Sequence, residues 1–421
     1  MANFMGRLGL SRDFRPGLYC PDAAHSQARR NRSNLMTVAR LQPFGPGRTA
    51  ALAVASTSAW LSLILLPYEV TTLADGFRLS PAAAGWISAV ELLALACTAG
   101  YLGRTIAARN KRALTILGVA IALVATLGCF LTDRVVLIVA LRLLFGIGTG
   151  LIAAATNALP ASHHSPKTLF AYMQIVLGLV FAVSIFMVSA MEPLAGHRVV
   201  FGVELILLLL LGPASLLLPE GIVRPLPSAA VRIEPRLPQG VTSSLAALVM
   251  MWVAQAAIWA FAAEAGAAAG LQPDSLARWL AIAGFTAPLG AAAASALGER
   301  RGYVGPLVLG YVAQILVALA MYCSASRGSY VVGVLINNMT TTFTTPYLMG
   351  ILATLDRTGR AAALGSGAVN FGCAVGPALG ATLIGMPTLA PIGIMSALVF
   401  VAGLGFGLFS LRNFSRQQLE A

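Results

Sequence analysis

Charged residues are scarce in this chain. Lys, Arg, Asp and Glu together make up 10% of its 421 residues, and the mean hydropathy is +0.81. Soluble globular proteins carry about 25% charged residues. The chain therefore has too little charge to fold as a water-soluble globule. Acidic residues are the scarcer sign, with 15 Asp and Glu against 28 Lys and Arg.

Patterns that bind metals or nucleotides, or that catalyse hydrolysis, are also missing. The five cysteines show no CxxC spacing, and the four histidines lie outside the middle of the apolar runs. We find no Gly-x4-Gly-Lys phosphate loop, no HExxH and no Ser-His-Asp arrangement. The adjacent pair His163 and His164 is a weak alternative as a metal site in a loop. The sequence predicts no enzyme, no cofactor and no metal centre, and ATP is not expected to act directly.

Long apolar runs are what the chain has instead. Each is about 18 residues or longer, which suffices for a helix to cross a hydrocarbon core of about 30 Å. The predicted fold is an all-α membrane protein with twelve transmembrane helices. We expect these spans at 49–70, 82–103, 113–132, 135–157, 168–190, 199–218, 242–264, 275–297, 304–325, 329–352, 361–386 and 390–411.

The positive charges are distributed unevenly between the two sides of the membrane. With twelve spans and the N-terminus inside, 22 of the 28 Lys and Arg fall on the cytoplasmic side and five on the outer side. This asymmetry follows the positive-inside rule. We expect a multi-pass protein of the inner (cytoplasmic) membrane with both termini cytoplasmic, in contact with lipid and not with nucleic acid.

A Pro- and Arg-rich loop divides the spans into six and six. The expected organisation is a basic cytoplasmic tail at 1–47, a six-helix bundle at 48–218, a linker at 219–241, a second bundle at 242–411 and a tail at 412–421. The first tail lacks the apolar core of a secretory signal, and Met36 offers an alternative start to Met1.

The two bundles resemble each other at an offset of 195 residues. Internal repeats of this kind are common in secondary transporters, which bind substrate between the repeats. The matches are Glu69 with Glu264, Trp60 with Gln255, Arg142 with Asn337, and Tyr101–Thr105 with Ala296–Arg300.

Two motifs resemble those of the major facilitator superfamily, and the resemblance covers about 48–411. "GYLGRTIAARNKR" at 100–112 is similar to the family's loop after the second span, although Arg104 replaces the usual acid. "RLLFGIGTG" at 142–150 is similar to its fourth-span motif, whereas the fifth span lacks the Gly-Pro motif of drug/proton antiporters. The resemblance implies two pseudo-symmetric six-helix bundles that work by alternating access. It also implies gating loops that contain Gly100, Arg104, Gly298, Glu299 and Arg300.

Two opposite charges are expected at similar depth in the membrane. Glu91 lies in the apolar stretch "SAVELLALAC" of the second span, and Arg142 lies in the fourth. Ionisable groups within a bilayer are costly and are therefore functional candidates. We expect Glu91 and Arg142 to couple transport to protons by exchanging partners. The alternatives are a permanent structural ion pair, or two residues that do not meet.

The tenth span contains two Asn and five Thr before Pro346, too many polar groups to face lipid. They are candidates for substrate contact, or for a hydrogen-bonded helix interface, because Thr can also bond back along its own helix. Three tryptophans offer flat surfaces for a ring, although membrane aromatics are often packing or interface residues. The candidate substrate contacts are Trp60, Gln174, Trp252, Gln255, Trp259, Asn337, Asn338, Thr341 and Asn370.

These features favour a monomeric secondary active transporter for a small organic solute. Arg142 favours an anionic group on the substrate, the tryptophans favour a ring, and the missing antiporter motif favours uptake. Efflux of a metabolite or toxic compound is the alternative direction. A sensor or assembly protein of the same fold is the alternative from another class, which the buried charges and the polar tenth span argue against.

Overall fold

The computed structural model describes residues 45–103, 105–106, 109–160, 166–219, 240–297, 302–324, 326–355 and 360–420. Within these ranges the chain is helical and has no β-strand. Several predicted features lie outside the described residues. They are the tail 1–44, His163, His164, the linker 220–239, and four gating-loop candidates, Arg104, Gly298, Glu299 and Arg300.

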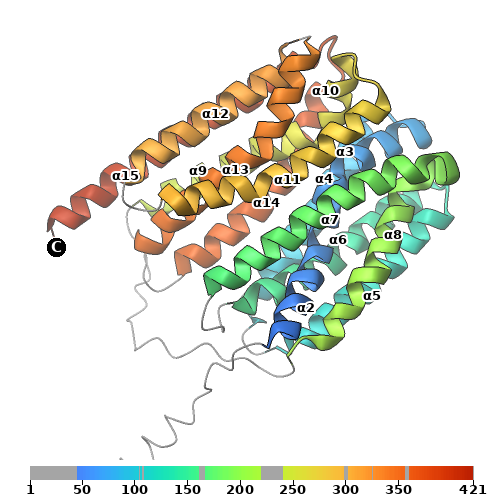
Figure 1. Cartoon of the computed structure of the whole chain (residues 1–421), viewed down its shortest axis with the longest axis horizontal. Coiled ribbons are helices and arrows are strands. Elements are labelled where there is room, and N and C mark those ends of the chain that lie inside the picture. Colours follow the sequence, from blue (N-terminus) through green and yellow to red (C-terminus); the bar gives the residue numbers. More distant parts are fainter. Residues whose placement is uncertain are drawn as a thin grey trace, which may run out of the picture. The chain divides into compact units, whose positions relative to one another are not determined.

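The first six crossings are built from α-helices with short 3-10 and π turns between them. Their bounds are α2 Pro46–Thr57, η1 Ser58–Trp60, α3 Leu61–Thr71, η2 Thr72–Gly76, α4 Pro81–Gly103, α5 Lys111–Leu131, α6 Val135–Ala158, α7 Pro166–Ala195, η5 Gly196–Arg198, α8 Val199–Leu211 and η6 Gly212–Leu217. In Figure 1, α5, α6 and α8 lie together in the blue-to-green part of the chain.

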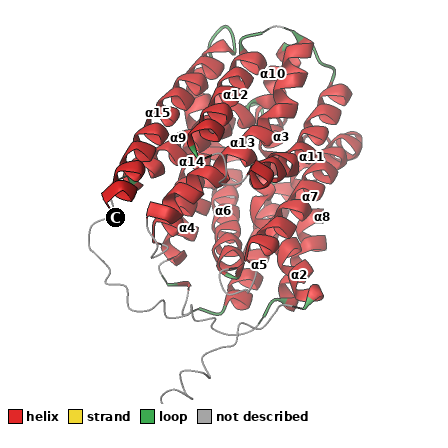
Figure 2. Cartoon of the chain, turned by 60° about the vertical axis from the view of Figure 1, so that its left-hand side comes forward, coloured by secondary structure: helices red, strands yellow, loops and turns green. Residues whose placement is uncertain are grey.

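In the described residues, the second six crossings are built from α-helices without 3-10 or π turns. Their bounds are α9 Val241–Ala260, α10 Ala262–Ala268, α11 Pro273–Leu297, α12 Val304–Tyr322, α13 Arg327–Leu355, α14 Arg360–Leu383 and α15 Ala390–Glu420. Figure 2 shows these elements as helices, and the described connections from α10 to α11 and from α14 to α15 are short.

All twelve predicted spans coincide with helices of the structure, so the twelve-helix fold is confirmed. By length and apolar composition alone, nine helical stretches of the described residues could cross a membrane. The smaller number has a simple cause. α7 and α8 form one continuous stretch, Tyr172–Leu217, while the polar α13 is too weakly apolar and α14 qualifies only as the shorter segment Gly367–Leu383.

Local sequence explains where several helices begin. Pro is the first residue of α4, α7 and α11, a position at which its missing N–H costs nothing and its fixed φ suits a helix. At the start of α5, the Asn110 side chain accepts a hydrogen bond from the Ala113 backbone N–H at 3.2 Å. This N-cap satisfies one of the donors that a helix leaves free at its first turn.

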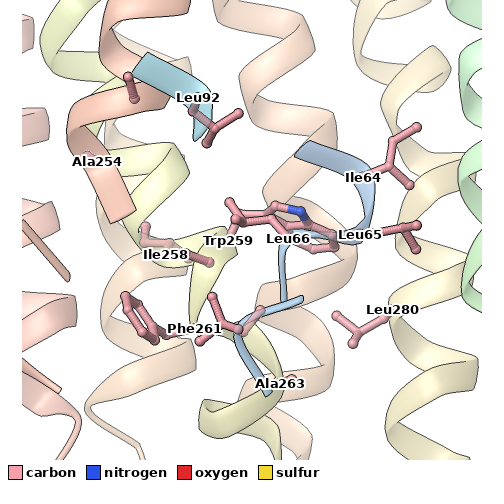
Figure 3. Close-up of a cluster of buried hydrophobic side chains, with 14 of the residues drawn as sticks. Ile64, Leu65, Leu66, Leu92, Ala254, Ile258, Trp259, Phe261, Ala263 and Leu280 are labelled. Atoms are coloured by element: carbon pink, nitrogen blue, oxygen red, sulfur yellow. The ribbon is translucent and has the colours of Figure 1, made fainter. Parts of the chain in front are cut away.

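Buried apolar side chains join the first six crossings to the second six. Figure 3 shows Leu65 and Leu66 of α3 in one cluster with Ile258 and Trp259 of α9 and Leu280 of α11. The Trp259 indole N–H also donates to the backbone oxygen of Leu63 at 2.7 Å. The two halves are thus held together by both apolar packing and a hydrogen bond.

Candidate functional site

Arg142 of α6 lies at the centre of a buried charge cluster. Its Nε is 2.5 Å from Oε2 of Glu91, on α4. Its Nη2 is 2.6 Å from Oε2 of Glu69, on α3, and its Nη1 is 2.7 Å from Oε2 of Glu204, on α8. All four side chains have 0% exposure. Four helices therefore meet at one guanidinium.

The structure brings Glu91 and Arg142 together and adds two acids that were not predicted as partners of Arg142. Glu69 was expected at the outer end of a span that stopped at residue 70. The π turn η2 extends that crossing to Gly76, about two helical turns further. Glu204 lies five residues after the start of α8 and is its one acid. An acid within an apolar stretch was the signal that identified Glu91, and it applied to Glu204 as well.

The three carboxylates are held in different ways. Glu204 accepts two hydrogen bonds from Arg142, at 2.7 and 3.3 Å. Glu69 accepts one from Arg142 at 2.6 Å and another from the Ser88 hydroxyl at 3.0 Å. Glu91 forms an ion pair with Nε, but its oxygens do not lie in hydrogen-bonding directions, and both lack a hydrogen-bond donor. Glu91 is therefore the one acid of the cluster that is held by an ion pair without an accompanying hydrogen bond.

Aromatic rings complete the enclosure of Arg142. The guanidinium carbon lies 4.6 Å from the ring centroid of Phe145 and 5.6 Å from that of Phe201. Such contacts attract a cation to the ring face. Three carboxylates and two aromatic rings therefore surround the guanidinium.

Glycines allow α6 to lie close enough to α4 for this cluster to form. A Cβ added to Gly146, one turn after Arg142, would collide with the backbone oxygen of Glu91. One turn further, a Cβ on Gly150 would lie 2.8 Å from the backbone oxygen of Leu95. The glycine motif of the fourth span therefore sets the distance between the helices that carry Glu91 and Arg142.

The predicted substrate contacts on α9 lie on adjacent turns. Trp252 is half-buried, Gln255 is 5% exposed, and Trp259 is 4% exposed. The Trp252 indole nitrogen and Gln255 Oε1 are buried without hydrogen-bond partners. The Trp259 ring centroid instead lies 5.3 Å from that of Phe181 of α7, with the rings tilted by 41°, and its indole N–H donates to Leu63. Trp252 and Gln255 keep a free donor and a free acceptor, whereas Trp259 is already engaged.

The polar residues of α13 divide between two neighbours. The Asn338 amide donates to the Ala283 oxygen of α11 at 3.3 Å, and Thr342 donates to the Ala287 oxygen at 2.6 Å. Thr341 accepts a hydrogen bond from Gln314 of α12 at 3.3 Å. A helix interface therefore accounts for Asn338.

Asn337 differs from these neighbours because its Nδ2 is buried without a partner. The five threonines of the stretch also bond back to carbonyl oxygens of α13 itself, as Thr side chains do in membrane helices. These bonds involve Thr340, Thr341, Thr342, Thr344 and Thr345.

The remaining predicted residues are dispersed. Trp60 is half-buried against the first-half core, and Asn370 is half-buried on α14. Gln174 is exposed on α7. Gly100 is exposed near the end of α4, with open space around an added Cβ. None of the four joins the Arg142 cluster.

Comparisons with known proteins identify the family and the fold of the chain. The family model described as Major Facilitator Superfamily matches residues 49–377. No curated protein matches the chain in sequence. The solved structure of a mutant of the nucleoside transporter NupG superposes with a TM-score of 0.67 at 13% identity, covering 87% of this chain and 98% of that chain. A D-xylose-proton symporter superposes with a TM-score of 0.68 at 17% identity, covering 86% and 96%.

At these identities the solved structures establish the fold alone. The family model matches well over half of the chain, and the matched residues include the whole charge cluster of Arg142 and its three acids. The chain is a multi-pass membrane protein of the transporter type and belongs to the major facilitator superfamily.

Proposed function

We propose that this protein is a proton-coupled secondary transporter that moves a small polar organic solute by alternating access. The observation that carries the proposal is the Arg142 cluster, in which one guanidinium meets Glu69, Glu91 and Glu204 with no exposed surface. Buried charges of this kind are expensive in a membrane protein and are commonly associated with proton or ion pathways.

Charge balance supports the uptake of protons by this cluster. Three ionised carboxylates and one guanidinium leave two net negative charges in a buried site. An uncompensated buried charge is unfavourable, and protonation of a carboxylate removes it. We assign the exchangeable proton to Glu91, because its oxygens accept no hydrogen bond. Arg142 would then shift between Glu91 and the other two acids as the proton arrives and leaves.

The proposed substrate is uncharged and ring-bearing. The sequence alone suggested an anion held by Arg142, but here that guanidinium is enclosed by three carboxylates. Trp252, Gln255 and Asn337 instead offer an indole N–H, an amide oxygen and an amide N–H that are buried and unpartnered. Groups of this kind bind hydroxyl, carbonyl or ring-nitrogen atoms of a neutral solute. One structural neighbour is named as a nucleoside transporter and the other as a D-xylose-proton symporter. Nucleosides and D-xylose are both neutral, ring-bearing solutes.

We propose further that the protein lies in the inner membrane with both termini in the cytoplasm, and that it takes up its substrate. The excess of Lys and Arg in the assigned cytoplasmic segments supports this orientation. The first experiment compares metabolites inside and outside cells of a deletion strain and a re-expressing strain by untargeted mass spectrometry. A solute left unused in the medium identifies an importer, whereas one that accumulates in the deletion strain identifies an exporter.

The coupling role is tested with the solute found in this way. Purified protein in liposomes should accumulate it when a proton gradient is imposed. Glu91→Gln should abolish accumulation but retain exchange across the membrane, because the neutral amide mimics a permanently protonated acid. Glu192→Gln, at an exposed glutamate near the end of α7, is the matched control. Proton-driven accumulation by Glu91→Gln would overturn the proposal and leave a structural ion pair.

A further inference from the structure

Glu264 is a half-buried acid with a buried carboxylate oxygen, and it lies apart from the Arg142 cluster. It lies on the short helix α10, which continues the crossing begun by α9. Its Oε2 atom is buried and has no hydrogen-bond partner. Among the described residues, Glu264 forms no ion pair with Lys, Arg or His. The carboxylate interacts with its own backbone N–H, but among the described residues no cation balances a negative charge on it.

The titratable groups around Glu264 come from three neighbouring elements and give it no cation. Asp75 of η2 is close enough to interact electrostatically and has the same sign of charge. Tyr322 of α12 and Tyr330 of α13 also interact with Glu264. Their hydroxyl groups donate to the backbone oxygens of Ile258, at 2.5 Å, and Ala262, at 2.7 Å. Those hydrogens are therefore not directed at the carboxylate.

Two other charged or titratable groups near this region do not neutralise Glu264 either. The Arg327 guanidinium, at the start of α13, packs against Gly270, with its nitrogens 3.2 and 3.3 Å from where a Cβ would lie. Tyr68 of α3 interacts with Tyr330 and with Glu192, and its hydroxyl has no hydrogen-bond partner. Tyr68 brings a neutral group from the first half toward the tyrosines of the second.

The internal repeat explains why the acid is unpaired. Glu264 is the second-half counterpart of Glu69, at the offset of 195 residues. Glu69 pairs with Arg142, but the counterpart of Arg142 is Asn337. The second half therefore keeps the acid of the first and lacks its cation.

Glu264 also lies where the two halves of the molecule touch. Its helix α10 packs against α3, and just before it the Phe261 ring lies between the two halves. A Cβ on Gly85 of α4 would be 2.8 Å from that ring, and one on Gly380 of α14 would be 2.5 Å from it. Trp259 donates across the same boundary to Leu63. Separation of the halves at this end would expose Glu264 to the solution that the charge distribution assigns to the outside.

We propose that Glu264 is a second proton-binding site, protonated while the two halves are closed over it and deprotonated when they separate at the expected outer end. The proton is the ligand, and the closed interface is what selects the neutral acid, since an unpaired carboxylate is costly to bury. The inference deepens the proposed function and relies on it for alternating access. It assigns to the second half a proton event distinct from the one at Glu91.

The test measures the separation of the halves directly and needs no substrate. Spin labels are attached to cysteines introduced at Arg78, in the loop after η2, and Gln272, in the loop before α11, after replacement of the five native cysteines. Both positions are exposed. Distances are then measured by pulsed electron paramagnetic resonance in lipid nanodiscs from alkaline to acidic pH. In the labelled protein that keeps Glu264, the distance between the two spin labels should shift from a longer to a shorter value as the pH falls.

Glu264→Gln should give the short distance at every pH, because the glutamine amide is neutral throughout the pH range and favours the closed interface. Glu264→Leu, an apolar side chain of similar size, should do the same and serves if the first variant does not fold. Asp133→Asn, at an exposed acid between α5 and α6 whose described partners are Arg198 and His197, is the control and should keep the pH response. A native pH response in both Glu264 variants would overturn the inference.

The two proposals can fail separately. If both Glu264 variants respond normally while Glu91→Gln loses proton-driven accumulation, the second site is wrong and the proposed function stands. If the Glu264 variants lose the response while Glu91→Gln still accumulates solute, the assignment of coupling to Glu91 is wrong.

Discussion

Gly146 of α6 lies directly against the backbone oxygen of Glu91 on α4, with no room between them for a side-chain carbon. The same helix carries Arg142 one turn earlier, and its Nε lies 2.5 Å from the Glu91 carboxylate. Backbone contact and ion pair are thus two consequences of one close helix crossing. Small residues permit such approaches in membrane proteins.

A first prediction is that Gly146→Ala separates α6 from α4 and weakens the whole charge cluster. Overpacking of this kind typically costs about 1–3 kcal/mol. The unfolding temperature of the purified protein should fall. Gly100→Ala is the matched control on α4, because open space surrounds a Cβ there and alanine favours a helix. Equal unfolding temperatures for Gly146→Ala and Gly100→Ala would contradict the proposed role of the close crossing.

A second prediction concerns the cation of the cluster. Arg142→Gln should destabilise the fold by about 3–5 kcal/mol, because removal of one partner leaves buried charges uncompensated. Adding Glu204→Gln should recover part of this loss, since it removes one carboxylate of a repelling set. The two changes should therefore be non-additive, as expected for groups in one network. Denaturation of both single variants and the double variant measures the coupling, and simple additivity would argue against a shared network.

The sequence predicted the fold well because the bilayer imposes strong rules. Length and apolar composition defined twelve helices, and the structure has a helix at each. It also predicted that Glu91 and Arg142 would lie at similar depth, because both positions can be counted along a helix of known rise. Periodicity and depth are local properties, so one chain suffices to estimate them.

The full membership of the cluster could not be predicted in this way. Glu69 lies deeper than expected because η2 prolongs the first crossing, and a π turn leaves no clear pattern in composition. Glu204 comes from α8, and its meeting with Arg142 depends on how α8 packs against α5 and α7. The same holds for Asn338, whose bond to Ala283 on α11 is a tertiary contact. Contacts between distant helices require the packed structure.

A third prediction concerns pH at the expected outer loops. The Arg198 side chain donates two hydrogen bonds of 2.6 Å to Asp133, and His197 lies 3.4 Å from it. These contacts, Arg198 first, hold the pKa of Asp133 below its usual value of 3.8. A carboxyl group with a lowered pKa contributes stability above its unfolded pKa and loses it as the pH falls through the folded one.

The unfolding temperature of the native protein should therefore exceed that of Asp133→Asn at neutral pH, by a small amount because the pair is exposed. The difference should remain constant down to about pH 5 and vanish once the pH falls below the lowered pKa. When Arg198→Gln is already present, the further substitution Asp133→Asn should change the unfolding temperature little at any pH. A difference that grew on acidification would have the wrong sign for this ion pair.

A fourth prediction concerns the contact between the two halves at Trp259. Trp259→Phe keeps an aromatic ring beside Phe181 but loses the N–H that donates to Leu63 at 2.7 Å. One such hydrogen bond contributes about 0.5–1.5 kcal/mol. Because the bond links α9 to α3, its loss should favour separation of the halves at this end. The spin-label pair at Arg78 and Gln272 should then report a larger fraction of the long distance at any given pH.

The control for Trp259→Phe is Trp86→Phe, because Trp86 is 49% exposed on α4 and makes no described hydrogen bond between the halves. That substitution should leave the distance distribution unchanged. If the two variants behave alike, the Trp259 bond does not hold the halves together, and the apolar cluster of α3, α9 and α11 alone must close this end. If only Trp259→Phe shifts the distribution, one indole N–H sets the balance between the closed and separated states that Glu264 is proposed to sense.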